Sequence, residues 1–401
     1  MLSIARTLKR DSIIVGILFI SQLLNFLQHM IFNPLGPDFT ASLHMNIADL
    51  GFFTTAYTLF SASIGCLGIF IFDRIDRKKI LLMSIAGVSF GTFIGTMAHD
   101  FWQMLFIRGL CGAMGGPLSA MVLAVIPDLL PEDRRGRAVG VVMSAFAVSS
   151  VVGVPVALQI SLKFGWKAPF YVVAMMGLAI FLMMWFFFPA IPAQVSDKKL
   201  SPTASIKSIS SNPAALISLL SVPTVLAGSY MIIPNFAAFA QFNLHLPRAY
   251  LTPLYFYGGI AALLGSQIGG RCCDYFGSFK INVVGTLMLI SSFVFCFLRV
   301  PPLLSPPIFM SIFMAGLSVR IVSFYTYFTQ IPEANYRASF MSAQSVINNL
   351  SIGLGAFLAS MMLMEDVNKQ LIGMDFVAGV AIILSSMTPF LLTRMMAANK
   401  T

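Results

Sequence analysis

Charged side chains are scarce in this chain of 401 residues. Asp, Glu, Lys and Arg together make up 10% of it, whereas a soluble globular protein has about a quarter. Hydrophobic residues make up 58%, which excludes a disordered chain, a collagen-like chain and a small disulfide-stapled secreted fold. The composition argues against a soluble enzyme. It indicates a protein whose surroundings are mostly lipid.

Cysteine and histidine are scarce as well. The five cysteines are odd in number, lie in apolar runs or at their ends, and have no zinc-ligand spacing with the four histidines. We therefore expect no disulfide framework, no metal site and no cofactor. The sequence also lacks a Gly-x4-Gly-Lys-Ser/Thr nucleotide-binding loop and a cluster of nucleophile, base and orienting group. It predicts neither a nucleotide-driven pump nor an enzyme.

Long apolar runs fill most of the chain. A run of about 20 residues is long enough for a helix to cross the roughly 30 Å hydrocarbon core of a membrane. The first run follows three basic residues, as in a signal peptide, but it holds Asn25, Gln28 and His29 and lacks a small-residue cleavage site, so we expect it to be retained. The predicted spans lie at about 12–34, 48–72, 80–98, 101–127, 138–161, 168–190, 214–243, 250–271, 279–298, 307–330, 338–362 and 373–394.

The 25 Lys and Arg residues lie mainly on one side of these spans. With the N-terminus inside the cell, eighteen of them fall on cytoplasmic segments and two fall inside spans. The other five are Lys163, Lys167, Arg248, Arg299 and Lys369. By the positive-inside rule we expect both termini in the cytoplasm. The membrane surface thus explains the net charge of +10 without a nucleic-acid partner, and we expect a multi-pass protein of a bacterial inner membrane.

Four landmarks of the first half recur in the second half at one offset of 201 positions. They pair as Asp73 with Asp274, Lys79 with Lys280, Pro131 with Pro332, and Glu132 with Glu333. A constant offset predicts duplicated six-helix halves, and transporters built this way have a cavity near the bilayer midplane. We expect an N-terminal bundle at 1–192, a cytoplasmic linker at 193–213 and a C-terminal bundle at 214–401.

Four segments resemble motifs of the major facilitator superfamily. Gly68–Lys79 is similar to its loop signature of a glycine, Asp-Arg, a second glycine and two basic residues, except that Ile69 and Asp76 replace glycines. The second half keeps both glycines in Gly270–Gly277. Span 4 carries an Arg-Gly motif in Arg108–Pro117, and Gly153–Pro155 resembles the Gly-Pro motif of drug:proton antiporters and sugar-efflux permeases.

The resemblance covers about residues 12–394. It implies an all-α polytopic membrane protein with twelve transmembrane helices in two pseudo-symmetric six-helix halves, the major facilitator fold, working by alternating access without enzyme chemistry. In the family, the loop aspartate closes a cytoplasmic gate by pairing with arginines and a helix N-terminus. Alternatively, the basic residues of the loop only anchor the cytoplasmic side. The gating residues implied here are Asp73, Arg74, Arg77, Arg271, Asp274, Gly153 and Pro155.

Ionisable residues inside the spans are candidates for function, because each costs about 2.5–3.5 kcal/mol at a helix centre. In span 1, Gln22, Asn25, Gln28, His29 and Asn33 recur at spacings of three and four, so the span is expected to face a polar space. His29 could exchange a proton, since imidazole titrates near pH 6.5; alternatively it is neutral and hydrogen-bonded to a carbonyl or to Asn25.

Besides His29, the basic residues away from the ends of the predicted spans are two arginines, Arg108 and Arg320. Arg108 is a candidate ligand group, or alternatively ties span 4 to span 1. Arg320 corresponds under the 201-residue offset to Ser119, so it is not a duplicated scaffold feature. Guanidinium groups favour an anionic or amphipathic solute. The predicted substrate and coupling residues are His29, Asn25, Gln28, Arg108, Arg320, Tyr325, Gln344 and Asn348.

These features predict a secondary active transporter that moves a small organic solute by alternating access, coupled to protons and directed outward. An uptake symporter or facilitator for an organic anion is the alternative. A transport-inactive membrane receptor is the alternative from another class, although no loop is long enough to fold as a receptor domain. The expected partners are the lipid bilayer, the solute and protons, and the expected state is a monomer.

Overall fold

The computed structural model describes residues 2–40, 42–71, 75–191, 212–298, 304–329, 331 and 337–398, and places side chains for all of these except 2–10, 69–71 and 337–339. Two compact units are formed. The first comprises Met1–His44 and Leu59–Ser196, and the second comprises Met45–Thr58 and Asp197–Thr401. The expected linker at 193–213 lies almost entirely outside the described residues, so the predicted domain boundaries stay a prediction.

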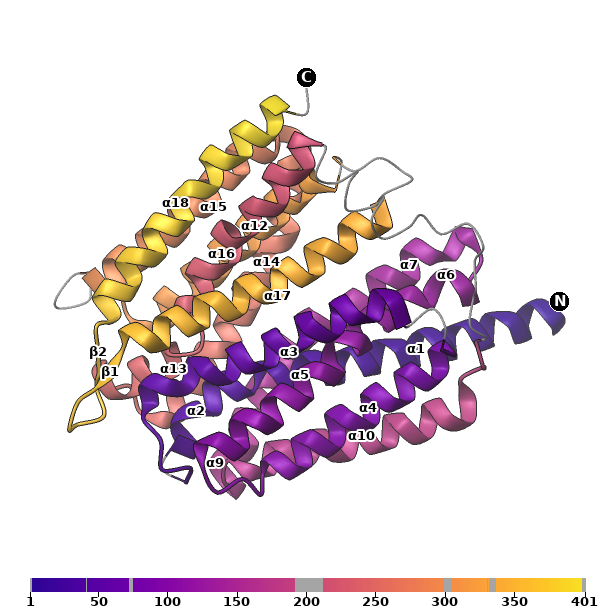
Figure 1. Ribbon diagram of the computed structural model, residues 1–401, viewed down its shortest axis with the longest axis horizontal. Coiled ribbons are helices and arrows are strands. Elements are labelled where there is room, and N and C mark those ends of the chain that lie inside the picture. The colour runs from indigo at the N-terminus through magenta and orange to yellow at the C-terminus, as the bar shows by residue number, and fades with distance from the viewer. Residues whose placement is uncertain are drawn as a thin grey trace. The chain divides into compact units, whose positions relative to one another are not determined.

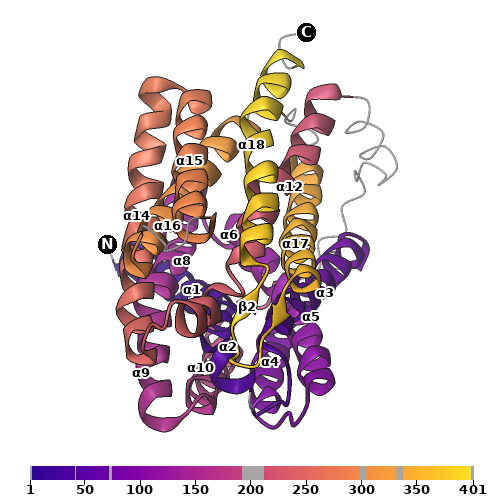
Figure 2. The same ribbon diagram turned by 90° about the vertical axis from the view of Figure 1, so that its left-hand side faces the viewer.

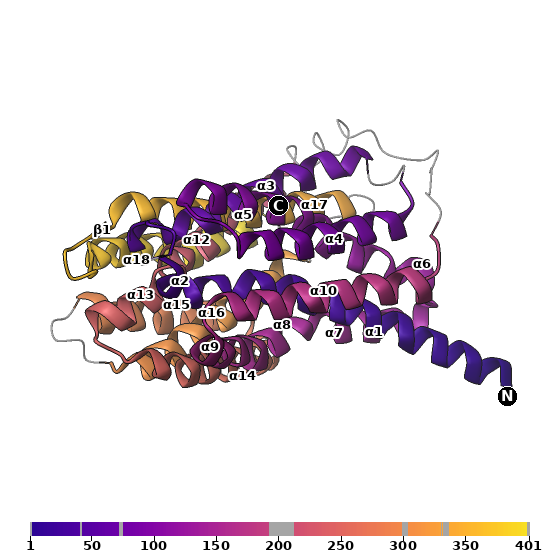
Figure 3. The same ribbon diagram turned by 90° about the horizontal axis from the view of Figure 1, so that it is seen from below.

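The first unit is a helical bundle in which α4 and α10 run side by side (Figure 3). Its helices are α1 (Leu2–Met30), α2 (Phe32–Thr40), α4 (Arg77–Gly95), α5 (Phe101–Ala124), α6 (Ile126–Leu129), α7 (Glu132–Met143), α8 (Ala145–Val148), α9 (Val154–Phe164) and α10 (Lys167–Phe187). Helix α3 (Leu50–Ile71) begins in the second unit and ends in the first.

The second unit is also helical, with α12 packed against α17 and α18 (Figure 1). Its longer helices are α12 (Pro213–Ile232), α14 (Leu251–Phe276), α15 (Ser278–Phe293), α16 (Pro306–Phe328), α17 (Arg337–Met362) and α18 (Met374–Ala398). Its short elements are the helices η1 (Ile47–Asp49), α13 (Phe236–Ala238), η4 (Phe239–Asn243), η5 (Arg248–Tyr250) and η6 (Val294–Leu298), and the strands β1 (Met364–Glu365) and β2 (Leu371–Ile372). The two strands pair antiparallel between α17 and α18.

Within the described residues, 11 helical segments are long and apolar enough to cross a membrane. Helix α14 is the twelfth long helix of the set, with 26 residues. At 1.5 Å per residue it is about 39 Å long, which is sufficient to span the hydrocarbon core. Its second half carries Arg271 and Asp274, which lower its hydropathy. The predicted all-α polytopic fold is confirmed, and the helices accommodate the predicted twelve spans.

Capping explains one departure from the loop signature. Asp76, which stands where the family has glycine, is the N-cap of α4, and its Oδ1 accepts hydrogen bonds from the backbone N–H groups of Lys78 at 2.8 Å and Lys79 at 3.4 Å. Aspartate is among the best N-cap residues because its oxygen satisfies helix N–H groups that have no partner in the helix. Asp76 therefore fixes the point at which α4 begins.

The Gly-Pro motif lies where span 5 departs from α-helical geometry. Ser149–Gly153 forms the π-helical turn η3, and Pro155 follows within the first turn of α9. Proline has no N–H to donate within the helix, and a π-turn is a common way to accommodate the irregularity. A Cβ on Gly153 would meet Leu27 Cδ1 of α1 at 2.7 Å, so the glycine also permits close packing of span 5 on α1.

Small residues bring α3 and α17 together inside the second unit. Thr55 Oγ1 donates to the Gly353 backbone oxygen at 3.0 Å, and the Phe52 and Phe357 rings meet edge to face at 5.8 Å. Close helix approach through glycine and threonine is typical of membrane proteins, where association depends on van der Waals packing and interhelical hydrogen bonds.

Candidate functional site

The polar residues of α1 bond mainly to α5. Gln22 Nε2 donates to Ser119 Oγ at 2.9 Å, and Asn25 Nδ2 donates to the Gly115 backbone oxygen and to Ser119 Oγ, both at 3.0 Å. The α5 positions are spaced so that they share one face of that helix. Span 1 therefore presents its polar face to a neighbouring helix. The sequence predicted this face, and one of the two alternatives for Arg108 placed span 4 beside span 1.

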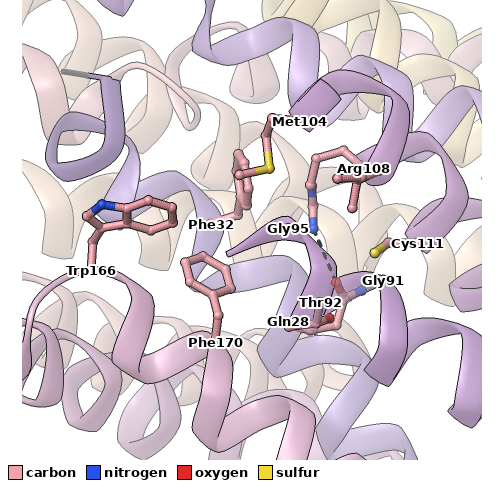
Figure 4. Close-up of a pocket in the computed structure, with 11 residues that line it drawn as sticks. Gln28, Phe32, Gly91, Thr92, Gly95, Met104, Arg108, Cys111, Trp166 and Phe170 are labelled. Carbon is pink, nitrogen blue, oxygen red and sulfur yellow. Dashed lines mark hydrogen bonds between the residues drawn. The ribbon is translucent and has the colours of Figure 1, made fainter. Parts of the chain in front are cut away.

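Arg108 continues this contact between α1 and α5. Its Nη1 donates to Gln28 Oε1 at 3.2 Å, and its Cζ lies 4.2 Å from the centre of the Phe32 ring, a cation–π geometry (Figure 4). The side chain is only 4% exposed. The arginine thus ties span 4 to span 1, and the same contacts hold its charge in a fixed place.

A small cavity adjoins Arg108 inside the first unit. It has a volume of about 20 Å³, room for about one water molecule. Phe32, Met104, Phe170 and Trp166 form its apolar side, while Arg108 and Gln28 supply the polar groups, as Figure 4 shows. A cavity of this size holds no organic solute in this conformation.

His29 lies beside this group at the end of α1. Its side chain is half-buried, and Arg108 is close enough for its charge to act on the imidazole. The structure therefore brings four of the predicted residues, Asn25, Gln28, His29 and Arg108, into one region of the first unit. A titratable ring next to a fixed positive charge is an arrangement in which a proton and a charged ligand influence each other.

Arg320 lies in the interior of the second unit and is 0% exposed. Its Nη2 donates to the Val225 backbone oxygen and, at 3.2 Å, to Ser229 Oγ, both on α12. No hydrogen-bond partner is found in the described part of the chain for its Nε and Nη1, and no carboxylate there forms an ion pair with it. A buried guanidinium held only by neutral oxygens is costly, so a role beyond packing is expected.

Tyr325, Asn348 and Gln344 form a separate polar group in the second unit. Tyr325 Oη donates to Asn348 Oδ1 at 2.7 Å, and Gln344 lies beside the same hydroxyl. All three side chains are half-buried. Tyr325 follows Arg320 by five residues, which places the two about 140° apart around α16. The buried arginine and this half-buried group therefore occupy different faces of one helix.

The predicted gating residues of the first half are described in part, since Asp73 and Arg74 lie outside the described residues. Arg77 forms an ion pair with Asp128 of α6, and the same Nη1 donates to the Ala124 backbone oxygen at 2.9 Å. The two paired side chains are 15% and 13% exposed. The pair joins the beginning of α4 to the end of span 4.

A second ion pair joins the N-terminal half of α1 to the beginning of α7. Arg134 Nη1 contacts Asp11 Oδ2 at 2.7 Å. Neither Asp11 nor Asp128 is among the predicted gating residues. Their signal in the sequence was an acidic residue at the end of an apolar run, which by itself does not indicate its partner.

The corresponding residues of the second half differ. Arg271 and Asp274 are exposed near the end of α14, and neither forms an ion pair with another described residue. Gly277 caps α14 with a φ of +84°, a conformation that glycine adopts without strain. The second half thus keeps the glycines and the aspartate of the loop motif and ends a helix there. Within the described residues, its Arg271 and Asp274 do not form ion pairs like that of Arg77 in the first half.

Comparisons with known proteins agree with the fold and the motifs. The family model of the Major Facilitator Superfamily matches residues 18–356. A probable sugar efflux transporter of Helicobacter pylori (strain J99 / ATCC 700824) is 24% identical over 334 residues, covering 81% of this chain and 82% of that protein.

Two further comparisons extend this finding. The uncharacterized MFS-type transporter YceJ of Bacillus subtilis (strain 168) is 24% identical over 257 residues, which span 64% of this chain and 66% of that protein. The solved structure of a bacterial homologue of the human lysosomal transporter Spinster, inward-facing and occupied, has a TM-score of 0.77 at 17% identity, covering 96% of this chain and 97% of that one. The chain therefore belongs to the Major Facilitator Superfamily, as a multi-pass membrane transporter of small solutes and not an enzyme.

Proposed function

We propose that this transporter exports a small amphipathic organic solute in exchange for protons. The observation that carries the proposal is the group formed by Asn25, Gln28, His29 and Arg108, which combines amides, a titratable imidazole and a fixed cation within one bundle. Efflux is supported by the likeness to the probable sugar efflux transporter of Helicobacter pylori. The solute is expected to bind through hydroxyl or carbonyl groups.

The chemistry of His29 determines how protons are coupled to transport. A neutral imidazole accepts a hydrogen bond from a solute hydroxyl, and protonation removes that acceptor and adds a positive charge beside Arg108. A proton then competes with a neutral or amphipathic solute for the same ring. Competition of this kind produces exchange, because the proton and the solute occupy the site alternately.

An anionic solute would reverse the sign of the coupling. Protonated His29 and Arg108 together attract a carboxylate or phosphate, so the proton and the anion bind cooperatively. Cooperative binding supports symport, which makes uptake of an organic anion the second candidate function. Arg108, held in place by Gln28 and Phe32, is the observation that favours it.

We propose that Tyr325, Gln344, Asn348 and Arg320 of the second unit also act in transport. The Tyr325 hydroxyl and its amide neighbours offer donors and acceptors suited to a polyhydroxylated or amphipathic solute. We further propose that the protein resides in a bacterial inner membrane with both termini in the cytoplasm, as the positive-inside rule predicts, and that it acts as a monomer.

The pH dependence of solute binding tests the proposal. The first step is a thermal-shift screen at two pH values with sugars, amphipathic drugs and organic anions, because a solute that binds the folded state stabilises it. For the best solute, export predicts affinity that falls on acidification, and anion symport predicts affinity that rises. His29→Gln should remove the dependence in either case, and His99→Gln, in an exposed loop, should keep it.

Flux measurements complete the test. In everted vesicles, an acidified lumen should drive accumulation of the solute, and His29→Gln should abolish this accumulation. Proton-driven accumulation at the wild-type rate by the His29→Gln variant would contradict the proposed coupling. If intact cells accumulate the solute and everted vesicles do not, the result would favour the second candidate function, uptake by symport.

A further inference from the structure

Three helices of the second unit form an apolar groove on its outer surface. Helices α14, α15 and α16 lie side by side (Figure 2). The groove between them has a volume of about 470 Å³. Leu264 and Ile268 of α14 form one wall, Val284 and Met288 of α15 form the other, and Ala315 and Val319 of α16 form the floor.

The sequence of α14 explains the depth of this groove. A Cβ on Gly265 would lie 2.9 Å from the Ala315 backbone oxygen, and a Cβ on Gly269 would lie 3.3 Å from Val319 Cα. The two glycines let α14 approach α16 closely. Because glycine has no side chain, these positions leave the space above Ala315 and Val319 empty. Leu264 and Ile268, which are 53% and 56% exposed, stand beside them as the wall.

A second, more open hollow of about 560 Å³ continues along α15. It shares Val284 and Met288 with the first groove and extends to Phe295. From Ile281 to Phe295 the two hollows follow α15 for about 21 Å at 1.5 Å per residue. This distance exceeds half of the roughly 30 Å hydrocarbon core, which is the depth that one leaflet occupies.

The lining offers a ligand almost nothing polar. The hydroxyls of Ser311 and Ser291 donate to carbonyls of their own helices, Pro307 at 2.8 Å and Met288 at 2.9 Å. The remaining lining residues are aliphatic or aromatic, or are glycine and cysteine. Hydrocarbon is the chemistry that fits such a surface, and two connected hollows suit two chains.

One end of the groove is charged. Cys272 and Ile281 line that end, and each is next in sequence to an exposed basic residue, Arg271 and Lys280. Asp274 is also exposed there, so the described charges of α14 and α15 at this end leave a net positive charge. Tyr275, 85% exposed, adds an aromatic side chain of the kind that lies at headgroup level.

We propose that this surface is a binding site for one anionic diacyl phospholipid. The acyl chains occupy the two hollows along α15, and the phosphate lies near Arg271 and Lys280. The positive end selects an anionic headgroup by charge, and the apolar hollows retain the chains. None of the residues proposed to act on the transported solute belongs to this site. Arg271 is shared only with the predicted gating residues of the repeated loop motif.

Native mass spectrometry of the purified full chain can test this site. The protein in detergent is titrated with phosphatidylglycerol and, separately, with phosphatidylcholine of the same chain length. We expect one phosphatidylglycerol to be retained per chain, at least threefold more strongly than phosphatidylcholine. Lys280→Gln should remove most of this preference, whereas Lys163→Gln, a change of an exposed lysine on α9 of the first unit, should leave it unchanged.

A groove-filling variant tests the acyl-chain part of the site. Ala261→Phe places a ring in the first hollow and should reduce retention of both lipids. If this variant does not fold, the Lys280→Gln comparison still decides the headgroup preference. Equal retention of the two lipids by the wild type, an unchanged preference in Lys280→Gln, or a protein dimer that Ala261→Phe dissociates would each overturn the proposal.

Discussion

The two units of this transporter handle charge in opposite ways. The first unit has four ion pairs within its described residues, and the best buried ones join Arg77 to Asp128 and Arg134 to Asp11. The second unit encloses Arg320 completely, and the described partners of its guanidinium are neutral oxygens. The first unit pairs charges at the ends of its helices, and the second isolates one in its middle.

The two units differ in how they place their charged residues, although the two halves of the chain repeat the same loop motif. Under the 201-residue offset, Arg77 corresponds to Ser278 and Asp128 to Thr329, so the second half cannot form the same ion pair. A paired charge at a helix end stabilises the fold modestly, whereas an isolated buried charge destabilises it. The comparison suggests that the charges of the first unit serve structure and gating, and that Arg320 is retained for transport.

Replacing the buried arginine should give the largest change. We expect Arg320→Met to raise the free energy of unfolding by about 1 to 4 kcal/mol, because apolar side chains often replace an uncompensated buried charge favourably. Thermal unfolding in detergent measures the gain, and a flux assay should show that transport is lost. A destabilised variant would mean that the bonds of Arg320 to Val225 and Ser229 are structural, which would remove the contrast between the units.

Breaking the ion pair of the first unit should act in the opposite direction. We expect Asp128→Asn to lower the free energy of unfolding by about 2 kcal/mol, since Arg77 would lose its charged partner while mostly buried. The same thermal unfolding assay applies. Glu132→Gln is the matched control, because its carboxylate is 90% exposed and its contact with Arg135 is a weak surface pair. Equal effects of the two substitutions would show that burial does not matter here.

The contact between α1 and α5 should contribute less. Asn25→Leu removes hydrogen bonds to the Gly115 oxygen and to Ser119, and we expect a loss of about 1 kcal/mol in the free energy of unfolding. Asn349→Leu on α17 is the control, since Asn349 bonds only to Ser345 of its own helix. A loss in the control as large as in Asn25→Leu would argue against a specific interhelical contribution.

The smallest expected effect concerns the β1–β2 hairpin of the second unit. Glu365 Oε2 accepts a hydrogen bond from the Ile47 backbone N–H at 2.6 Å, which caps the beginning of η1 and α3. We expect Glu365→Ala to lower the free energy of unfolding by about 0.5 kcal/mol, the low end of the range for the loss of a helix cap. Hydrogen exchange at the beginning of α3 should increase while exchange in α5 is unchanged. Unaltered exchange at Ile47 would show that the cap does not stabilise this end.

Hydropathy predicted the helices well because a membrane span must be continuous and apolar. Apart from the α1–α2 break and the π-turns, most predicted spans coincide with the long helices to within about five residues. The exceptions are α1, which begins at Leu2 where the span was predicted from 12, and α7, which begins at Glu132 where the span was predicted from 138. Asp76 shows the limit of motif matching, because its replacement of a glycine looked like a lost motif residue and proved to be a helix cap. The polar face of span 1 was also predicted, since helical spacing is a local property.

Apart from the contact of Arg108 with span 1, which was one of two alternatives for that residue, the partners of the charged residues could not be predicted. Asp11 and Asp128 are ordinary acidic residues in sequence, and they are paired only because folding brings distant helix ends together. Arg320 and Arg108 looked like members of one electropositive set. In the structure one is sealed between α16 and α12, and the other bridges α5 and α1.

The sequence by itself determined that the chain crosses a membrane many times, which family it resembles and which few polar side chains its helices carry, because hydrophobicity, helical period and short motifs are properties of neighbouring residues. The tertiary structure alone decided which of those side chains meet. The free-energy cost of burying a guanidinium depends on the oxygens around it. In this fold those oxygens come from helices that lie roughly 50 to 120 residues away in sequence.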